Sequence, residues 1–217
     1  MIHCKEILFK YPNSEFKLEI PQLRIESTDR IAIVGPSGSG KTTLINLLSG
    51  ILNPMKGDIF INNINLTEYN KSDLQDIRIV QMGLIFQEFR LIEYLNVYEN
   101  IIVPFRINSI LKLTNEVRQR ASELAKMVGL EDKLLKFPSK LSQGERQRVA
   151  ICRALIGQPK VLLCDEPTAN LDPTNRDNIL SILKNYSLNK KIPLVVITHD
   201  ESILPNFNRV LNIEEFK

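Results

Sequence analysis

The sequence has few of the features that mark secreted and membrane-spanning proteins. It contains only three cysteines, Cys4, Cys152 and Cys164. Their spacing fits neither a disulfide framework nor a metal site and suits a reducing compartment. No apolar run approaches the roughly 18 residues of a membrane span, and residues 1–6 do not resemble a signal peptide. We therefore expect a soluble, cytoplasmic protein without direct membrane insertion, whose role at any membrane would depend on a partner.

An excess of charge of one sign is also lacking. Lysine and arginine number 28 against 25 aspartate and glutamate, which gives a formal net charge of +3. This balance argues against nucleic acid or an anionic membrane surface as a partner. We found no internal repeat and no low-complexity tract. The 217 residues, of which 43% are hydrophobic, are enough for one large domain or two small ones with a full core.

The most informative pattern that is present lies at residues 35–42. They read Gly-Pro-Ser-Gly-Ser-Gly-Lys-Thr, a complete phosphate loop of the form G-x-x-x-x-G-K-[ST]. An apolar run at 31–34 precedes the loop as an expected buried strand, and residues 43–48 follow with helical character. These flanks argue against the alternative, an ordinary glycine turn between a strand and a helix.

The loop predicts an ATP site with a magnesium ion. The glycines let successive backbone N–H groups point inward, where they would bind phosphate oxygens together with the N-terminus of the following helix. Lys41 would reach the β and γ phosphates, and the Thr42 hydroxyl would bind Mg²⁺. The nucleotide-binding residues expected here are Gly35, Pro36, Ser37, Gly38, Ser39, Gly40, Lys41, Thr42 and Thr43.

Two acidic residues supply the expected second half of this site. Residues 161–164 are wholly apolar and precede Asp165 and Glu166. Asp165 would hold Mg²⁺, and Glu166 would lie beside the γ-phosphate and polarise the attacking water. The alternative is a strand that ends in two solvated acids. His199 follows the apolar run 194–197, so we expect it at the same edge of a parallel sheet, although a lone histidine after a strand is often structural.

The remaining pattern indicates an α/β core interrupted by helices. Apolar runs predict further strands at 57–61 and 83–86. Between residues 88 and 158 the periodicity is helical. One helix there buries a single face and ends at Gly129, and another begins with a capping box at Ser142. Asp172 and Pro173 open a later helix. The residues expected on the buried face of the first helix are Val117, Ala121, Leu124, Ala125 and Val128.

Residues 141–147, Leu-Ser-Gln-Gly-Glu-Arg-Gln, resemble the signature motif of the ATP-binding-cassette (ABC) ATPases. The order of the other elements resembles that family along essentially the whole chain: Tyr11, the phosphate loop, Gln87, the signature, Asp165 with Glu166, residues 169–172, and His199. The resemblance implies one domain, 1–217, of the α/β class. Its RecA-like P-loop NTPase core would comprise residues 1–87 and 159–217, with N-terminal antiparallel β strands, and an inserted α-helical subdomain would comprise 88–158.

The resemblance also implies roles for single residues. Tyr11 would stack on adenine, and Gln87 would reach Mg²⁺ and the attacking water and sense a transmembrane partner. Glu166 would be the general base and His199 would clamp the γ-phosphate, so that these two residues, with Gln87 and Lys41, form the catalytic set.

Four residues are expected to act on the nucleotide of a second subunit. Ser142, Gln143 and Gly144 match the groups that contact the opposite γ-phosphate, and Asp172 matches the loop that links the two sites. A homodimer that forms on ATP binding is therefore implied. Ser142 and Asp172 could equally be simple helix caps, which is compatible with function. Gln143 departs from the glycine common in the family. It is tolerable if its φ is negative, but its bulk could loosen the phosphate contact.

Finer detail resembles a subfamily. Residues 82–87, 91–92, 97–101 and Pro104 look like those of lipoprotein-release and macrolide-export ATPase subunits, and 166–172 agree. The implied function is the ATP-hydrolysing motor of an ABC transporter complex, peripheral on the inner face of the cell membrane through a separate permease. A cell-division-type ABC ATPase that signals through a membrane partner without transport is nearly as similar. A soluble, non-transport ABC protein is disfavoured, because such proteins usually carry two cassettes or a long coiled-coil insertion.

The segment 88–104 is rich in apolar and aromatic side chains, namely Phe89, Leu91, Tyr94, Leu95 and Tyr98. They could pack in the core of the helical insertion. They could instead form a groove for a short coupling helix of the permease. Both interpretations stay open for different side chains.

Overall fold

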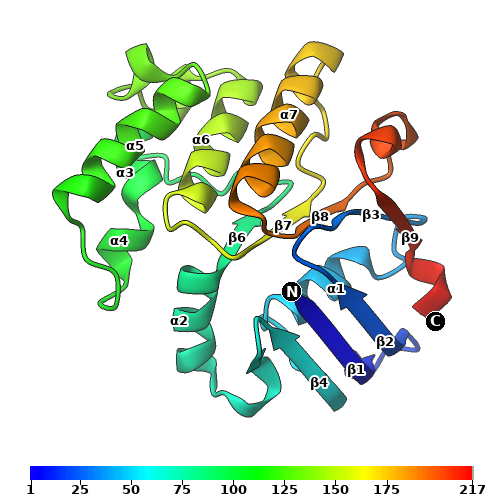
Figure 1. The fold of residues 1–217 in the computed structure, drawn as a ribbon. Coiled ribbons are helices and arrows are strands. Elements are labelled where there is room, and N and C mark those ends of the chain that lie inside the picture. Colours follow the sequence, from blue (N-terminus) through cyan, green and yellow to red (C-terminus); the bar gives the residue numbers. More distant parts are fainter. Residues whose placement is uncertain (217) are drawn as a thin grey trace.

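The computed structural model describes residues 1–216, which build two sheets and the helices between and above them (Figure 1). The first sheet is antiparallel, with the strand order β2-β1-β4-β5. Its strands are β1 (Ile2–Lys10), β2 (Lys17–Ile25), β4 (Lys56–Ile61) and β5 (Ile64–Asn65). β1 and β2 bury alternate side chains on one face, which is the pattern of a sheet with one solvated face.

The second sheet is parallel and has the order β6-β7-β8-β3-β9. Its strands are β3 (Arg30–Val34), β6 (Met82–Ile85), β7 (Val161–Asp165), β8 (Leu194–Ile197) and β9 (Arg209–Asn212). β7 and β8 are buried along their whole length, as expected for central strands with both faces covered. The carboxyl ends of β3, β6, β7 and β8 lie at one edge, from which the functional loops start.

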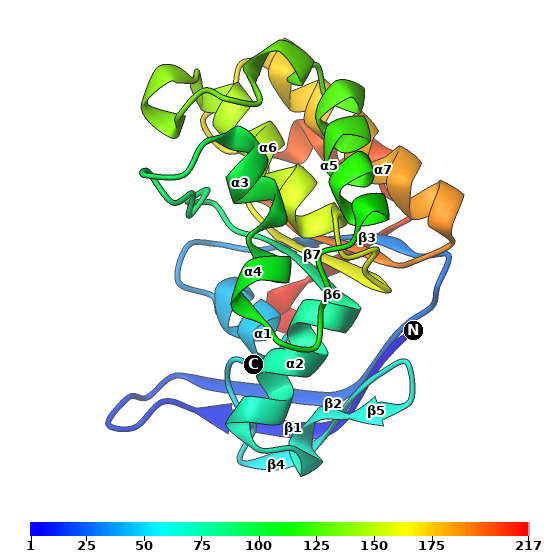
Figure 2. The ribbon, with the colours of Figure 1, turned by 90° about the vertical axis from the view of Figure 1, so that its left-hand side faces the viewer.

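Helices cover both faces of the parallel sheet. They are α1 (Lys41–Leu48), α2 (Lys71–Gln81), α3 (Val97–Ile102), α4 (Pro104–Ile107), α5 (Asn115–Met127), α6 (Gln143–Leu155) and α7 (Pro173–Lys190). Short 3-10 turns lie at Leu66–Glu68, Glu131–Lys133, Pro138–Lys140, Glu201–Asn206 and Ile213–Phe216. In Figure 2 the layers are, from top to bottom, α3 with α5, α6 and α7, then the parallel sheet, then α1 and α2, then the antiparallel sheet.

Two hydrophobic cores fill the spaces between these layers. One joins the antiparallel sheet, α1 and the parallel sheet, and the other joins the parallel sheet to α3, α5, α6 and α7. The expected buried face of α5 is confirmed, because four of the five named residues lie in this helix, Val128 is its C-cap, and all five are buried in the second core. Gly129 after α5 has φ +71°, and Ser142 forms the expected capping box with Glu145.

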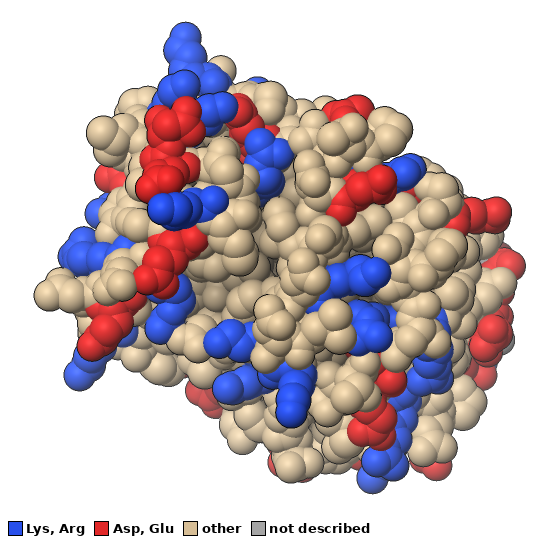
Figure 3. Space-filling model, turned by 45° about the horizontal axis from the view of Figure 1, so that its top comes forward, with Lys and Arg blue, Asp and Glu red and all other residues tan. Residues whose placement is uncertain are grey.

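The fold class predicted from the sequence is confirmed: an α/β core with N-terminal antiparallel strands and a helical layer. Helices α3 to α6 all lie within residues 88–158. On the face shown in Figure 3, basic and acidic side chains are interspersed, in keeping with the small net charge. Among residues 1–216, no helix combines the length and the apolar character needed to cross a membrane.

Candidate nucleotide site

The loop between β3 and α1 borders a cavity of about 380 Å³. The residues that line this cavity come from distant parts of the chain: Tyr11, Phe16, Ser37, Gly38, Gly40, Lys41, Thr42, Thr43, Gln87, Asp165, Glu166 and Ile197. Most of them were expected from the sequence. They meet here because β3, β6 and β7 run parallel, so the segments that follow these strands gather at one edge of the sheet.

The backbone of the phosphate loop comes very close to a neighbouring side chain. Gly40 has φ +106°, and a Cβ there would lie 2.6 Å from the Phe16 ring, so only glycine fits. Phe16 was not expected from the sequence, because it has no spacing relation to the loop. The Lys41 ammonium donates hydrogen bonds to the carbonyls of Gly35, at 2.7 Å, and Pro36, at 2.8 Å. These bonds hold the charge over the loop, within reach of a phosphate that would replace the carbonyls.

Asp165 ends β7 as a buried carboxyl group. Burial raises its pKa above the ordinary value, and the Thr42 hydroxyl and the Lys41 charge oppose that rise only in part. A buried carboxylate whose charge is incompletely compensated favours a bound cation. Together, the Asp165 carboxylate, the Thr42 hydroxyl and the Gln87 amide offer hard oxygen donors. This donor set fits Mg²⁺.

Glu166 and His199 form a contact that joins two strands of the sheet. His199 Nδ1 lies 2.7 Å from Glu166 Oε1, although the two residues are 33 positions apart. The Glu166 side chain is only 12% exposed, whereas that of His199 is 70% exposed. Glu166 has φ +49°, a strained conformation for a non-glycine residue, and such strain is often found at functional sites. Glu166 therefore lines the phosphate-loop cavity, whereas the exposed imidazole of His199 does not line it and borders a neighbouring cavity together with Glu166.

Tyr11 also lines the cavity of the phosphate loop. Its ring meets Phe9 edge-on, with 4.8 Å between centroids, and meets Phe16 at a tilt. Its hydroxyl is 3.1 Å from the Thr43 hydroxyl. The residue is 38% exposed. It therefore offers an aromatic face beside the phosphate loop, as stacking on a base requires.

The residues expected to act in trans lie elsewhere. Ser142, Gln143 and Asp172 are exposed at the starts of α6 and α7, and none of them lines the cavity with the phosphate loop. Gln143 has no positive φ, so the backbone condition for a side chain there is met. Ser142 is also an N-cap, because its hydroxyl accepts from the Glu145 N–H, and Lys133 forms an ion pair with Glu145.

The start of α6 is tied to the segment after β7 by three residues to which the sequence analysis gave no role: Asn175, Arg148 and Gln147. A Cβ on Gly144 would lie 3.0 Å from the Asn175 amide oxygen. Asn175 donates to the Asp172 carboxylate at 2.6 Å and accepts from Arg148 at 3.1 Å. Gln147 donates to the Pro167 carbonyl at 2.6 Å. The start of α6 and the loop 166–172 are thus held together within one subunit.

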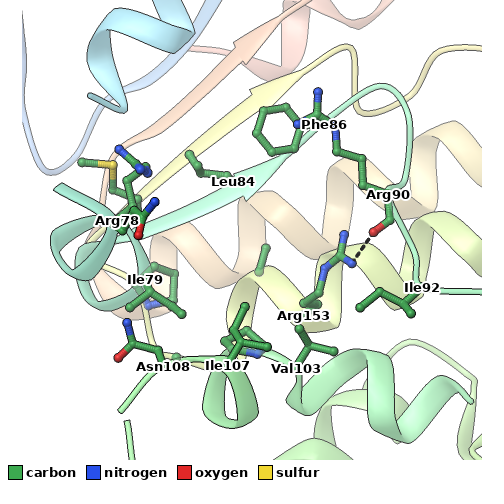
Figure 4. Close-up of a pocket in the computed structure, with 16 residues that line it drawn as sticks. Arg78, Ile79, Leu84, Phe86, Arg90, Ile92, Val103, Ile107, Asn108 and Arg153 are labelled. Carbon is green, nitrogen blue, oxygen red and sulfur yellow. Dashed lines mark hydrogen bonds between the residues drawn. The ribbon is translucent and has the colours of Figure 1, made fainter. Parts of the chain in front are cut away.

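A second cavity, of about 610 Å³, lies beside the nucleotide site between α2, β6, α6 and the segment around α4 (Figure 4). The expected segment 88–104 contributes Arg90, Ile92, Val103 and Pro104. The aromatic residues named in advance do not line it. Leu91 and Tyr98 pack against the second core, and Tyr94 is 79% exposed. The wall formed by α2 and β6 was not foreseen, because its residues carry no local signal of a groove.

Comparison with known proteins agrees with this geometry. Residues 18–169 match the family model described as ABC transporter. The chain is 38% identical over 190 residues to "ABC transporter ATP-binding protein YtrE" of Bacillus subtilis, covering 85% of this chain and 81% of that protein. It is 36% identical to "Lipoprotein-releasing system ATP-binding protein LolD" of Saccharophagus degradans, covering 99% of this chain and 94% of that protein.

Two further similarities bear on function and fold. "Methionine import ATP-binding protein MetN 1" of Staphylococcus aureus is 37% identical over 194 residues, covering 89% of this chain and 56% of that longer protein. A solved structure, described as the dimeric structure of a post-hydrolysis state of the ATP-binding cassette MJ0796 bound to ADP and Pi, is 33% identical. It superposes with a TM-score of 0.87 and covers 98% of this chain and 94% of that one.

Proposed function

The chain belongs to the ABC transporter family, and from this premise we propose that it is the motor subunit that powers a separate permease of the lipoprotein-release or macrolide-export type. Its activity is that of an ABC ATPase, which converts ATP and water to ADP and phosphate. The relatives include both a lipoprotein-releasing and a methionine-importing protein at nearly equal identity. The choice of export therefore rests on the resemblance of residues 82–87, 91–92, 97–101 and Pro104, with which residues 166–172 agree.

One observation carries the proposal: the phosphate loop, Gln87, Asp165 and Glu166 line a single cavity. Lys41 would exchange the carbonyls of Gly35 and Pro36 for phosphate oxygens, which bind its charge more strongly. Thr42, Gln87 and Asp165 would hold Mg²⁺, and this ion, when bound, would neutralise charge on the β and γ phosphates.

Hydrolysis then needs a base and a means of orienting it. In our proposal Glu166 accepts a proton from the attacking water while the water oxygen bonds to the γ-phosphorus. The bond from that phosphorus to the β–γ bridging oxygen breaks, and ADP and phosphate leave. The 2.7 Å contact with His199 supports a role of this residue in orienting the Glu166 carboxylate, and we propose that the imidazole also binds the γ-phosphate.

The signature residues are proposed to complete the site of a second copy. Ser142 and Gln143 are exposed at the start of α6, and Asp172 is exposed nearby at the start of α7. A helix N-terminus with exposed polar groups suits a phosphate presented by another subunit. ATP would then bridge two copies, and loss of the γ-phosphate would let them separate. The groove of Figure 4 would receive a coupling helix of the permease and keep the protein at the inner face of the membrane.

The test is the substitution Glu166→Gln, which keeps the shape of the side chain but removes the base. ATP hydrolysis should fall by at least about 100-fold, while the variant binds Mg-ATP and elutes as a dimer in size-exclusion chromatography with light scattering. Glu123→Gln, on the exposed face of α5, is the control and should hydrolyse ATP as the wild type does. A Glu166→Gln protein that stays monomeric in saturating Mg-ATP would refute ATP-driven dimerisation.

The partner is tested with the same variant. Tagged Glu166→Gln protein is recovered from native membranes with Mg-ATP present, and co-purifying proteins are identified by mass spectrometry. A multi-span protein with a large extracytoplasmic domain would support the export proposal. A cell-division membrane protein would instead support signalling without transport, and a soluble machine would contradict both.

A further inference from the structure

The groove of Figure 4 joins apolar walls to an unusual concentration of positive charge. Its volume of about 610 Å³ lies within the range of ligand pockets, about 300–1,000 Å³. Ile79, Leu84 and Val103 are among its apolar residues. Three arginines, Arg78, Arg90 and Arg153, also line it. The apolar walls suit the apolar side chains of an amphipathic helix, and the arginines require in addition a group of negative charge.

The hydrogen bonds and the ring contact of the three guanidinium groups are all with neutral groups, although the charge of Arg90 also acts on the Asp165 carboxyl group. Arg78 donates to the carbonyl of Gly50 at 2.8 Å. The Arg90 guanidinium lies over the Phe86 ring, 4.1 Å from its centroid. Arg153 donates to the carbonyls of Phe89 and Arg90, each at 2.6 Å. No aspartate or glutamate from residues 1–216 lines the groove or forms an ion pair with these arginines.

Among the three arginines, Arg153 has the greatest need of an opposite charge. It extends from α6 into the groove, and burial lowers the pKa of its guanidinium, as does the nearby charge of Arg90. An arginine has five N–H donors in a planar fork, of which the two carbonyls use two. A carboxylate that entered the groove could bind the remaining donors and neutralise charge that is otherwise buried without an opposite charge.

Arg153 also connects the groove to the nucleotide site. The carbonyls that it holds belong to the second and third residues after Gln87, and Gln87 lines the phosphate cavity. Phe86, directly before Gln87, lines the groove. A group that binds Arg153 therefore acts on the segment 87–90 from the groove, while Gln87 faces the phosphate cavity.

We propose that the groove recognises an amphipathic helix that carries a carboxylate within its apolar face, and that this carboxylate pairs with Arg153, with Arg90 beside it. The inference rests on the proposed function, in which a permease supplies the helix, and adds what chemistry that helix must bring. It also assigns Arg153 as the residue through which the helix positions the segment that follows Gln87.

The test uses two synthetic probes and the full-length protein. The first is a short, capped, helix-forming peptide with leucines at i, i+3 and i+4 and one glutamate within the leucine stripe. The second has glutamine in place of that glutamate. Binding of each labelled peptide is measured by fluorescence anisotropy with the wild type, Arg153→Gln, Arg90→Gln and the control Arg118→Gln, an exposed arginine on α5 away from the groove.

The glutamate peptide should bind the wild type about tenfold more tightly than the glutamine peptide, which corresponds to about 1.4 kcal/mol. This preference should vanish in Arg153→Gln, shrink in Arg90→Gln and persist in Arg118→Gln. Binding of the glutamate peptide to the wild type should also change amide hydrogen exchange of the segment 87–92. Thermal unfolding of each variant identifies any that fails to fold, and Arg90→Gln then serves as the second test.

Equal binding of the two peptides to the wild type, binding of neither, or a preference that survives in Arg153→Gln would overturn the inference. An unchanged exchange rate at 87–92 would overturn the positioning role of Arg153. ATP hydrolysis and the Glu166→Gln dimer are measured on the same preparations. If those two results hold while the peptides are not distinguished, only this inference fails and the proposed function stands.

Discussion

A methyl group added at Gly144 would test the contact between the start of α6 and the start of α7. The added Cβ would lie 3.0 Å from Asn175 Oδ1 and 3.1 Å from its Cγ, closer than ordinary carbon contacts. Asn175 cannot yield freely, because its amide donates to Asp172 and accepts from Arg148. Gly144→Ala should therefore force the Asn175 side chain away from one or both partners.

The size of the effect follows from two opposing terms. Overpacking at a closely packed position costs about 1–3 kcal/mol. Alanine recovers up to about 1 kcal/mol of helix propensity, and less than that in the first turn. The net loss in the free energy of unfolding should be about 1–2 kcal/mol, which for a chain of this length lowers Tm by about 2–8 °C.

The assay is thermal unfolding of nucleotide-free protein, so that any contact of Gly144 with ATP does not contribute. Asn175→Ala makes room for the methyl group, and in that background Gly144→Ala should be neutral or stabilising. The double-mutant cycle should give a coupling energy of about 1 kcal/mol or more. Gly157→Ala is the control, because its Cβ would meet only an ordinary 3.4 Å contact. A Gly144→Ala protein as stable as the wild type, with additive double-mutant effects, would refute the reasoning.

Two more predictions follow from buried polar groups. Burial raises the pKa of Asp165 above its ordinary 3.8. The nucleotide-free protein therefore loses stability as pH rises from 3.8 through the raised pKa, and at neutral pH it bears the whole cost in unfolding free energy of a buried, ionised carboxylate. Asp165→Asn should thus raise Tm without nucleotide in differential scanning fluorimetry, yet lose the extra stabilisation by Mg-ATP. The exposed Asp132→Asn should do neither, and an unchanged or lower Tm for Asp165→Asn would contradict the prediction. Asn100 is fully buried, and its side-chain amide forms hydrogen bonds with backbone groups of Ile92, Leu95 and Asn96. Asn100→Ala should lower the free energy of unfolding in urea by about 3 kcal/mol, against about 0.5 kcal/mol at most for the exposed Asn189→Ala; similar values for both would show that the Asn100 bonds contribute little.

Local chemistry made much of the nucleotide site predictable. The phosphate loop and the capping box of Ser142 depend on residues a few positions apart, so their patterns are visible in the chain. The strand ends at Asp165 and Ile197 were visible too, because wholly apolar runs stop there. The buried face of α5 followed from helical periodicity in the same way.

The residues that line the groove could not be predicted from local patterns. The apolar and aromatic residues of the segment 88–104 left core packing and a groove both open. Leu91 packs in the core, Tyr94 points to solvent, and neither lines the cavity. Apolar character shows that a side chain prefers burial and does not show against which surface. No local pattern in the sequence marked Arg153, on α6, as a residue that lines the groove.

The amino-acid sequence alone was enough to identify the family, the phosphate loop, the order of the elements and the acidic pair at the end of β7, because each is encoded by neighbouring residues. Which distant groups meet became visible in the folded chain alone. The contacts of Glu166 with His199, Gly144 with Asn175, and Arg153 with the carbonyl of Arg90 each join residues that are tens of positions apart. The sheet order and the packing of α6 and α7 create these contacts, and no periodicity along the chain records them.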